Sequence, residues 1–277
     1  MHIITIATEQ NNWLEDWEMS INQWGYNYSI LGMGVPWDGF CTKIKLILDF
    51  LHTRELSEII CIVDAYDLVF AGPQDELNKK FKSFNSPIVV GGEDICFLNC
   101  HKHTCDVNNE KYRWVNGGCI IGFVKNLIDA YTFVLDVSPQ DDQVGIAKYM
   151  DKYPSEVTID GNQKLIANIR RINEIKKIDG KRFQHVETGT IPVIVHTPFM
   201  YSDLGARSEF VRKHALNEYE SPEFLTYTTG LFKHLYKHLT KNPVYNNIKY
   251  IVYVVIVFII VYIFYLLHRR YKNSNNG

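Results

Sequence analysis

Short apolar runs alternate with amphipathic stretches over the first two hundred residues of the chain. A short continuous apolar run is typical of a strand buried inside a parallel sheet, and the runs are residues 3–8, 26–31, 59–63, 87–90, 119–123 and 191–195. Between them, apolar positions recur near helical spacing over residues 13–24, 42–56, 75–84, 127–135 and 142–150. This alternation predicts an α/β fold in which helices flank a mostly parallel sheet.

The C-terminal pattern is different. Residues 251–267 read IVYVVIVFIIVYIFYLL, without a charge, glycine or proline, and with Ile248 and Tyr250 they are just long enough to cross a bilayer core of about 30 Å. A buried core helix is the alternative, which we disfavour because the segment has no polar face to turn toward water. We therefore expect a C-terminal transmembrane helix at 248–267, preceded by an amphipathic juxtamembrane segment at 226–247 and followed by a basic tail at 268–277.

Composition and the N-terminus narrow the class of protein. The chain has 277 residues, of which 46% are hydrophobic and 22% charged, which is globular rather than disordered. The net charge of −2 gives no electrostatic reason to expect a nucleic-acid partner. The N-terminus starts a strand at once and lacks the basic and apolar regions of a signal peptide. We therefore expect a single-pass, tail-anchored membrane protein with the chain up to residue about 245 in the cytosol.

Three of the six cysteines cluster in one predicted loop. Cys96, Cys100 and Cys105 lie there with His101 and His103. A zinc site is one interpretation, but the spacing matches no standard zinc knuckle, so we favour a plain loop. In the cytosol these cysteines would remain thiols, whereas a luminal domain would allow a disulfide in this loop.

Two aspartates follow the most apolar strand. The run Ile59–Val63 leads directly into Asp64 and, three positions later, Asp67. Acidic side chains at the carboxyl end of such a strand lie where open α/β sheets bind ligands. Two neighbouring carboxylates repel each other, and a bound Mg²⁺ or Mn²⁺ removes that cost and can hold a diphosphate. The alternative is that one aspartate caps the next helix and the other solvates a turn.

Three further positions carry candidate chemistry. Asn116-Gly117-Gly118 leads into a strand, where two glycines allow either close approach to a ligand or a simple turn. A late strand ends at His196, which is either a ligand or a strand-end histidine satisfied by its neighbours. Asp141 and Asp142 begin a predicted helix, where acids are favoured as N-caps in any case.

In this order the segments resemble the glycosyltransferase domain of the procollagen lysyl hydroxylase family. The resemblance runs over about two hundred residues, and the matching segments are Thr5–Thr8, Val63–Pro73, Gly92-Glu93, Trp114–Phe123, Asp141–Gln143 and Pro192–His196. Each segment alone is weak, but their joint order and spacing are specific to the family.

The resemblance implies a GT-A fold over residues 1–225 that binds a UDP-sugar through Mn²⁺. The metal ligands that it implies are Asp64, Asp67 and His196. The positions that it places near the donor are Thr8, Trp37, Lys43, Asp64, Tyr66, Gly117 and Gly118. Tyr66 would stack on the uracil or, alternatively, pack in the core.

The resemblance also assigns catalytic candidates, which are Asn116, Asp141 and Asp142. Asn116 would lie close to the donor sugar, and one aspartate would orient the acceptor hydroxyl or act as a base. We expect the aspartate pair beside the sugar, on the opposite side of the pocket from the metal. Helix N-capping is the alternative role for the pair.

The implied reaction is transfer of glucose or galactose from UDP-glucose or UDP-galactose to a hydroxyl of a glycan or protein. A collagen-like acceptor, with hydroxylysine or galactosyl-hydroxylysine, comes from this analogy alone. The chain departs from the family at Thr197–Met200, where the family has Gly-Asn-Gly followed by a lysine, and at Phe97, where it has tryptophan. These departures leave open a catalytically weak, membrane-anchored protein that binds a glycan or a partner, and a nucleotide-sugar hydrolase is a third possibility.

Overall fold

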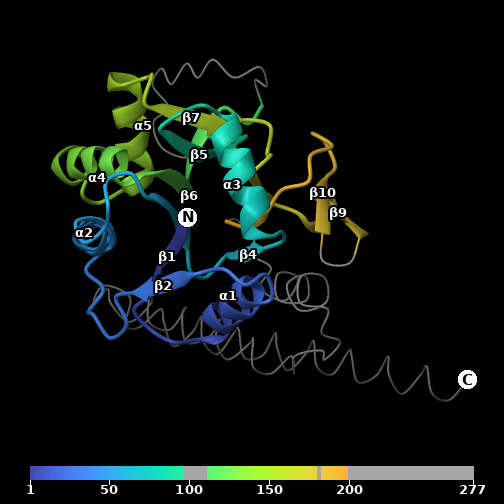
Figure 1. Cartoon of the computed structure of the whole chain (residues 1–277), viewed down its shortest axis with the longest axis horizontal. Helices are drawn as coiled ribbons and strands as arrows, with labels where there is room; N and C mark the ends of the chain where they lie inside the picture. The colour runs from blue at the N-terminus through green and yellow to red at the C-terminus, as the bar shows by residue number, and fades with distance from the viewer. Residues whose placement is uncertain (97–110, 180–181, 199–277) are drawn as a thin grey trace, which may run out of the picture. The chain divides into compact units, whose positions relative to one another are not determined.

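The computed structural model describes residues 1–96, 111–179 and 182–198 (Figure 1). Its centre is a six-stranded sheet in the order β2-β1-β3-β6-β5-β7. The strands are β1 (His2–Ile6), β2 (Tyr28–Leu31), β3 (Ile59–Asp64), β5 (Ile88–Glu93), β6 (Trp114–Phe123) and β7 (Val157–Asp160). The helices are α1 (Asn12–Asn22), α2 (Phe40–Leu51), α3 (Gln74–Ser83), α4 (Val124–Val137) and α5 (Asp142–Lys152).

The sheet is mostly parallel, as expected, but it is mixed because one of its six strands, β6, runs in the opposite direction. The pairs β1–β2, β1–β3 and β5–β7 are parallel, but β6 runs antiparallel to both of its neighbours, β3 and β5. Glu93 at the end of β5 pairs with Trp114 at the start of β6. The chain therefore enters β6 at the same end of the strands at which it leaves β5. An apolar run predicts burial of a strand but carries no information about its direction.

Both faces of the sheet are covered, which explains the continuous apolar runs. On one face, Ile60 and Ile62 of β3 belong to a core built with α2, α4 and α5. On the other face, Cys61 and Val63 of the same strand pack with α1 and α3 (Figure 1). Successive residues of a strand point to opposite faces, so every position of β3 up to Val63 is apolar.

A second, three-stranded sheet has the order β4-β11-β8, with β4 (Leu68–Phe70), β8 (Ile166–Asn168) and β11 (Ile194–His196). Strand β11 is antiparallel to β4 and parallel to β8, which sets His196 opposite Leu68 on one side and Asn168 on the other. The hairpin β9 (Ile175–Asp179) and β10 (Arg182–His185) follows a 3₁₀ turn at Ile172–Glu174. The three-stranded sheet β4-β11-β8 places the late part of the chain next to the segment that follows β3.

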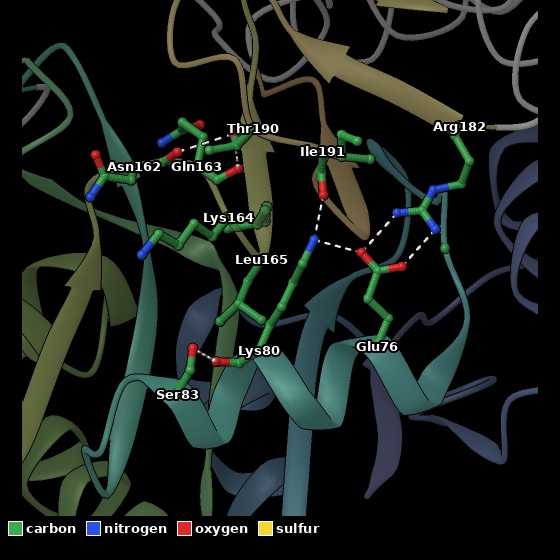
Figure 2. A network of polar contacts seen from close by, with 12 residues as sticks. Glu76, Lys80, Ser83, Asn162, Gln163, Lys164, Leu165, Arg182, Thr190 and Ile191 are labelled. Atoms are coloured by element: carbon green, nitrogen blue, oxygen red, sulfur yellow. Dashed lines mark hydrogen bonds and ion pairs between the residues drawn. The ribbon is translucent and has the colours of Figure 1, made fainter. Parts of the chain in front are cut away.

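A polar network fastens α3 to this late part of the chain. Glu76 of α3 forms a bidentate pair with Arg182 of β10, at 2.6 and 2.8 Å. Lys80, one turn further along α3, pairs with Glu76 at 2.6 Å and donates to the carbonyl of Ile191. Figure 2 shows these three side chains converging between helix and hairpin. Ile191 lies just before β11, so the network supports the strand that ends at His196.

Several predicted segments lie outside the described residues: the juxtamembrane segment, the transmembrane helix, the basic tail, and all but Cys96 of the cysteine–histidine loop. Among the helices that the structure describes, none has the length and apolarity to cross a membrane. Cys96 is disulfide-bonded, whereas Cys41, Cys61 and Cys119 are free. A disulfide at Cys96 differs from the thiol expected in the cytosol.

Candidate active site

Asp64, Asp67 and His196 converge at the junction of the two sheets. Asp64 is the last residue of β3, Asp67 comes just before β4, and His196 ends β11. Their ligand atoms all lie within 4.8 Å of one another. Nε2 of His196 is 3.4 Å from Oδ2 of Asp67 and 3.8 Å from Oδ2 of Asp64. The structure therefore brings together the three residues that the resemblance implies as metal ligands.

The backbone beside this cluster is fixed independently of its side chains. The amide and the hydroxyl of Thr197 both donate to the main-chain carbonyl of Asp67, at 2.7 and 3.0 Å. These bonds tie the residue after His196 to the second aspartate. Both bonds are accepted by the main-chain carbonyl of Asp67 and do not involve its carboxylate.

The donor set fits a divalent cation. Nε2 of His196 is buried and has no hydrogen-bond partner, and it faces two carboxylates. A buried polar atom left without a partner is costly, and a metal ion would satisfy it. Two carboxylate oxygens and one imidazole nitrogen are ligands of the kind that Mn²⁺ and similar ions accept. The residues at this site therefore fit the metal that the resemblance implies.

The pKa shifts of His196 and Asp64 also indicate that the cluster favours a bound positive charge. Burial alone would lower the pKa of His196, but the carboxylates of Asp67 and Asp64 overcome this effect and raise it. Partial burial raises the pKa of Asp64, and Asp67 adds to the rise while Lys43 opposes it. Without a metal, a proton on His196 supplies part of the charge that the two carboxylates attract.

Lys43 of α2 connects the metal-ligand candidates to α5. Its buried Nζ lies 2.9 Å from Oδ1 of Asp64 and 2.7 Å from Oδ2 of Asp142. Burial would lower the pKa of Lys43, but Asp142 and Asp64 raise it well above its ordinary value. Asp64 thus uses one oxygen for Lys43 and turns the other toward His196. Asp142 and Asp64 therefore share one ammonium group, and the position of Asp142 relative to a donor sugar stays a prediction.

The two adjacent aspartates have different roles in the structure. Asp141 is the N-cap of α5, and its Oδ1 accepts a hydrogen bond from the amide of Val144 at 2.9 Å. Asp142 is the first residue of the helix and is 3% exposed. The capping role considered for the pair therefore belongs to Asp141, while Asp142 faces Lys43.

The glycine pair lies inside β6 and does not leave open space. A Cβ atom on Gly118 would lie only 2.1 Å from Cε1 of His196, and one on Gly117 would lie 3.3 Å from Cβ of Gln143. The room beside Gly118 is occupied by the imidazole of His196, which corrects the interpretation of these glycines as a turn or as space for a sugar. Gly118 is instead what allows β6 to approach the metal-ligand candidate.

Asn116 and Gln143 share a carboxylate. Oε2 of Glu93 accepts from Asn116 at 3.2 Å, and Oε1 accepts from Gln143 at 2.9 Å. The oxygens of the two amides in turn accept from the backbone amides of Gly118 and Gly117, each at 2.9 Å. Burial raises the pKa of Glu93 to about 7, although Asn116 and Gln143 act in the opposite direction. Glu93 therefore holds the side chains that line this stretch of β6.

Comparison with known proteins identifies the family. Residues 1–212 match the family model described as the PLOD GT domain. The chain belongs to this family. It is therefore a glycosyltransferase by family, with a mixed sheet flanked by helices.

Relatives of the PLOD GT family extend well beyond this chain. Procollagen-lysine,2-oxoglutarate 5-dioxygenase 1 of Bos taurus is 24% identical over 82% of this chain and 32% of its own length. The multifunctional procollagen lysine hydroxylase and glycosyltransferase LH3 of Pongo abelii is 26% identical over 70% of this chain and 29% of its own. The chain thus spans about a third of the length of these relatives.

A solved structure is also similar. It is a glycosyltransferase involved in the glycosylation of the major capsid of PBCV-1, with a TM-score of 0.48 and 11% identity. The match covers 77% of this chain and 97% of that chain.

The remaining donor candidates of this PLOD GT domain lie on separate loops. Thr8 follows β1, and its carbonyl accepts from the amide of Gly34 at 3.0 Å. Trp37 is 49% exposed, and its ring packs edge-on with the ring of Phe40. Tyr66 packs partly against the core, and its hydroxyl donates to the carbonyl of Glu9 at 3.2 Å. Core packing, considered as the alternative for Tyr66, therefore accounts for part of its ring.

Two residues of this PLOD GT site had not been assigned a role from the sequence. Glu93 stands at the carboxyl end of a predicted strand, where ligands bind in open α/β sheets, so its position was a usable signal. Asn168 contacts His196 at 2.7 Å, but it lies in a three-residue strand that no apolar run marks. Its contact depends on the pairing of β8 with β11 and could not be seen along the chain.

Proposed function

We propose that this domain is a Mn²⁺-dependent hexosyltransferase that moves glucose or galactose from a UDP-sugar to a hydroxyl acceptor. The observation that supports it most is the cluster of Asp64, Asp67 and His196, in which a buried imidazole nitrogen without a hydrogen bond faces two carboxylates. These residues would hold the ion. When bound, the ion would supply positive charge for the leaving diphosphate, the main electrostatic task of this reaction.

The neighbouring side chains support specific roles. Lys43 holds Asp64 with one carboxylate oxygen turned toward His196. Asp142 is the candidate that orients the acceptor hydroxyl or takes its proton, and the ammonium group of the same Lys43 holds its carboxylate in place. Asn116 faces the donor sugar in this proposal, and Glu93 fixes its amide. Thr8, Trp37 and Tyr66 would contact the nucleotide.

The acceptor and the location of the protein are also proposals. The names of the relatives contain procollagen lysine, which supports a collagen-like acceptor bearing hydroxylysine or galactosyl-hydroxylysine, or another glycan or protein. From the apolar segment 251–267 we propose a single C-terminal membrane span, and a tail anchor would place the domain in the cytosol. The disulfide at Cys96 favours an oxidising compartment over the cytosol, so protease protection in microsomes is the deciding measurement.

One feature favours the rival function of a catalytically weak binding protein on this fold. Thr197 replaces the glycine that follows the histidine in the family, and both of its donor groups are used on the carbonyl of Asp67. They therefore contribute nothing to a diphosphate in this conformation. A binding protein would bind UDP-sugar without turning it over.

The deciding experiment measures Mn²⁺-dependent UDP binding by calorimetry and UDP release from UDP-glucose and UDP-galactose, with and without hydroxylysine acceptors. Acceptor-dependent release supports the transferase, and release that needs no acceptor supports a hydrolase. Binding without release supports the rival binding protein. Asp67→Ala should abolish Mn²⁺-dependent UDP binding without unfolding the domain, because the two hydrogen bonds from Thr197 go to the main-chain carbonyl of Asp67, which the substitution keeps. Asp129→Asn, on the exposed surface of α4, is the matched control.

A further inference from the structure

Asn168 lies directly behind the imidazole of His196. The two residues are register partners on the parallel strands β8 and β11, and they are 6% and 1% exposed. Nδ1 of His196 is 2.7 Å from Oδ1 of Asn168, on the side of the ring away from the two aspartates that Nε2 faces. The ring is thus held between an amide on one side and a pair of carboxylates on the other.

The orientation of the Asn168 amide is fixed by a group that can only accept. Nδ2 of Asn168 donates to the carbonyl of Gly92 at 2.8 Å, so Oδ1 must be the atom that faces His196. An amide oxygen only accepts hydrogen bonds, and Nδ1 of His196 must therefore carry the proton. In the neutral ring, the lone pair is then on Nε2.

The support for Asn168 extends one residue further. The backbone amide of Asn168 donates to Oε1 of Gln163 at 2.7 Å, and Nε2 of Gln163 donates to the same carbonyl of Gly92 at 2.7 Å. Gln163 is fully buried and adopts a positive φ of 54°. Gln163 thus supports the same carbonyl and the backbone of Asn168, while the direction of the Asn168 amide is fixed by its own bond to Gly92.

We propose that Asn168 is a positioning residue that sets the tautomer of His196 and so directs the Nε2 lone pair to a divalent cation. The inference rests on the proposed function, because the cation is the one that Asp64, Asp67 and His196 would hold. A histidine ligand needs its second nitrogen to donate to a fixed acceptor, which fixes both the tautomer and the ring orientation. Asn168 supplies that acceptor as a neutral amide.

The first measurement needs no metal. Long-range ¹⁵N–¹H spectra of histidine-labelled protein, recorded where the ring is neutral, report which nitrogen carries the proton, and His196→Gln identifies the signal among the ten histidines. Wild-type protein should show the proton on Nδ1. Asn168→Leu should give a mixture of tautomers, whereas Asn168→Asp, which keeps an acceptor, should restore the Nδ1–H form. A wild-type ring with its proton on Nε2 would overturn the proposal.

The second measurement is Mn²⁺ affinity, read from water-proton relaxation. Asn168→Leu should weaken binding by about 10- to 100-fold, the usual effect of losing such a partner, and Asn168→Asp should remain near wild type. The control is Gln163→Met, which removes two buried hydrogen bonds of Asn168 and Gly92 but none of His196. It should lower stability and leave the tautomer unchanged.

The outcomes separate this proposal from the proposed function. If wild-type protein binds no Mn²⁺, the proposed function fails, but the metal-free spectra still decide the role of Asn168. If Asn168→Leu does not fold, the wild-type tautomer and the Asn168→Asp variant decide it. An unchanged tautomer and an unchanged Mn²⁺ affinity in a folded Asn168→Leu protein would contradict the proposal and leave Asn168 with a structural role only, through its hydrogen bond to Gly92.

Discussion

The missing side chain of Gly118 leaves the space that the imidazole of His196 fills. Because a Cβ atom there would lie 2.1 Å from the ring, Gly118→Ala must displace either the histidine or β6. We expect a loss of about 1–3 kcal/mol in the free energy of unfolding, as for other overpacked sites, and a loss of Mn²⁺ affinity of at least about tenfold. Chemical denaturation and metal titration measure the two effects.

Gly117→Ala is the matched control for this substitution. Its Cβ atom would lie 3.3 Å from Cβ of Gln143, and a shift of a few tenths of an ångström relieves that contact. It should therefore keep most of its metal affinity. Equal losses of metal affinity in the two variants would show that the glycines are needed for the packing of β6 and not for the position of His196.

Glu93 gives the metal-free protein a pH-dependent stability. The folded state holds its proton up to about pH 7, while the unfolded chain releases it near pH 4.5, so the folded state binds more protons between these values. The free energy of unfolding should therefore fall as pH rises through this interval, by on the order of 3 kcal/mol from this group. Glu93→Gln, which does not titrate, should flatten the profile measured by urea denaturation. An unchanged slope would contradict the raised pKa of Glu93.

Some residues of the site can be predicted from the sequence and others cannot, and the difference has a physical reason. Asp64 and His196 end strands, and strand ends are recognisable from the apolar run before them. Glu93 and Asn168 act through Asn116 and His196, which lie 23 and 28 positions away. Such contacts are set by strand pairing and not by the local pattern.

At the scale of elements, the start of α5 separates two functions of adjacent carboxylates. Asp141→Ala should cost about 1 kcal/mol of stability because it removes the N-cap, while Asp141→Asn should be nearly silent because asparagine caps as well. Asp142→Asn weakens the pair with Lys43 and should lower the rate of sugar transfer while UDP affinity is retained. Equal transfer rates in wild type and Asp142→Asn would remove Asp142 from the chemistry.

The contact between α3 and the β9–β10 hairpin makes a second prediction at this scale. Arg182 and Glu76 form a bidentate pair with side chains 20% and 26% exposed, so it should be worth more than a surface pair. Arg182→Met keeps the aliphatic stem and should lower the free energy of unfolding by about 1–2 kcal/mol. A double-mutant cycle with Glu76→Gln isolates the coupling. The Arg54–Glu58 pair, an i,i+4 pair whose arginine is 33% exposed, should contribute less than about 0.5 kcal/mol.

The elements that the sequence predicts well are the long ones. All five helices of the central domain were predicted within a few residues, because each carries an apolar face over three turns or so. The strands β4 and β8 have three residues each and were not predicted, whereas β11 was predicted because it ends the apolar run 191–195. The reversed direction of β6 was missed because hydrophobicity does not encode it.

At the scale of the whole molecule, we predict that the glycosyltransferase domain folds and binds its ligands without the predicted membrane segment. The family model ends at residue 212, well before the apolar run 251–267. Deletion of the residues after Asn246 should therefore leave Mn²⁺ and UDP binding unchanged, as measured by thermal shift with both ligands. Loss of folding on this truncation would show that the apolar run belongs to the core of the protein.

The pairing of β4 with β11 has a consequence for how the protein is made. Asp64 and His196 are 132 positions apart, and long loops must close before such contacts form, which makes them late events in folding. A growing chain on the ribosome therefore has two of the metal ligands long before it has the third. If the site binds a divalent cation as proposed, the ion would be held by all three ligands only after β11 docks. Added Mn²⁺ should therefore slow unfolding and leave the rate of folding nearly unchanged.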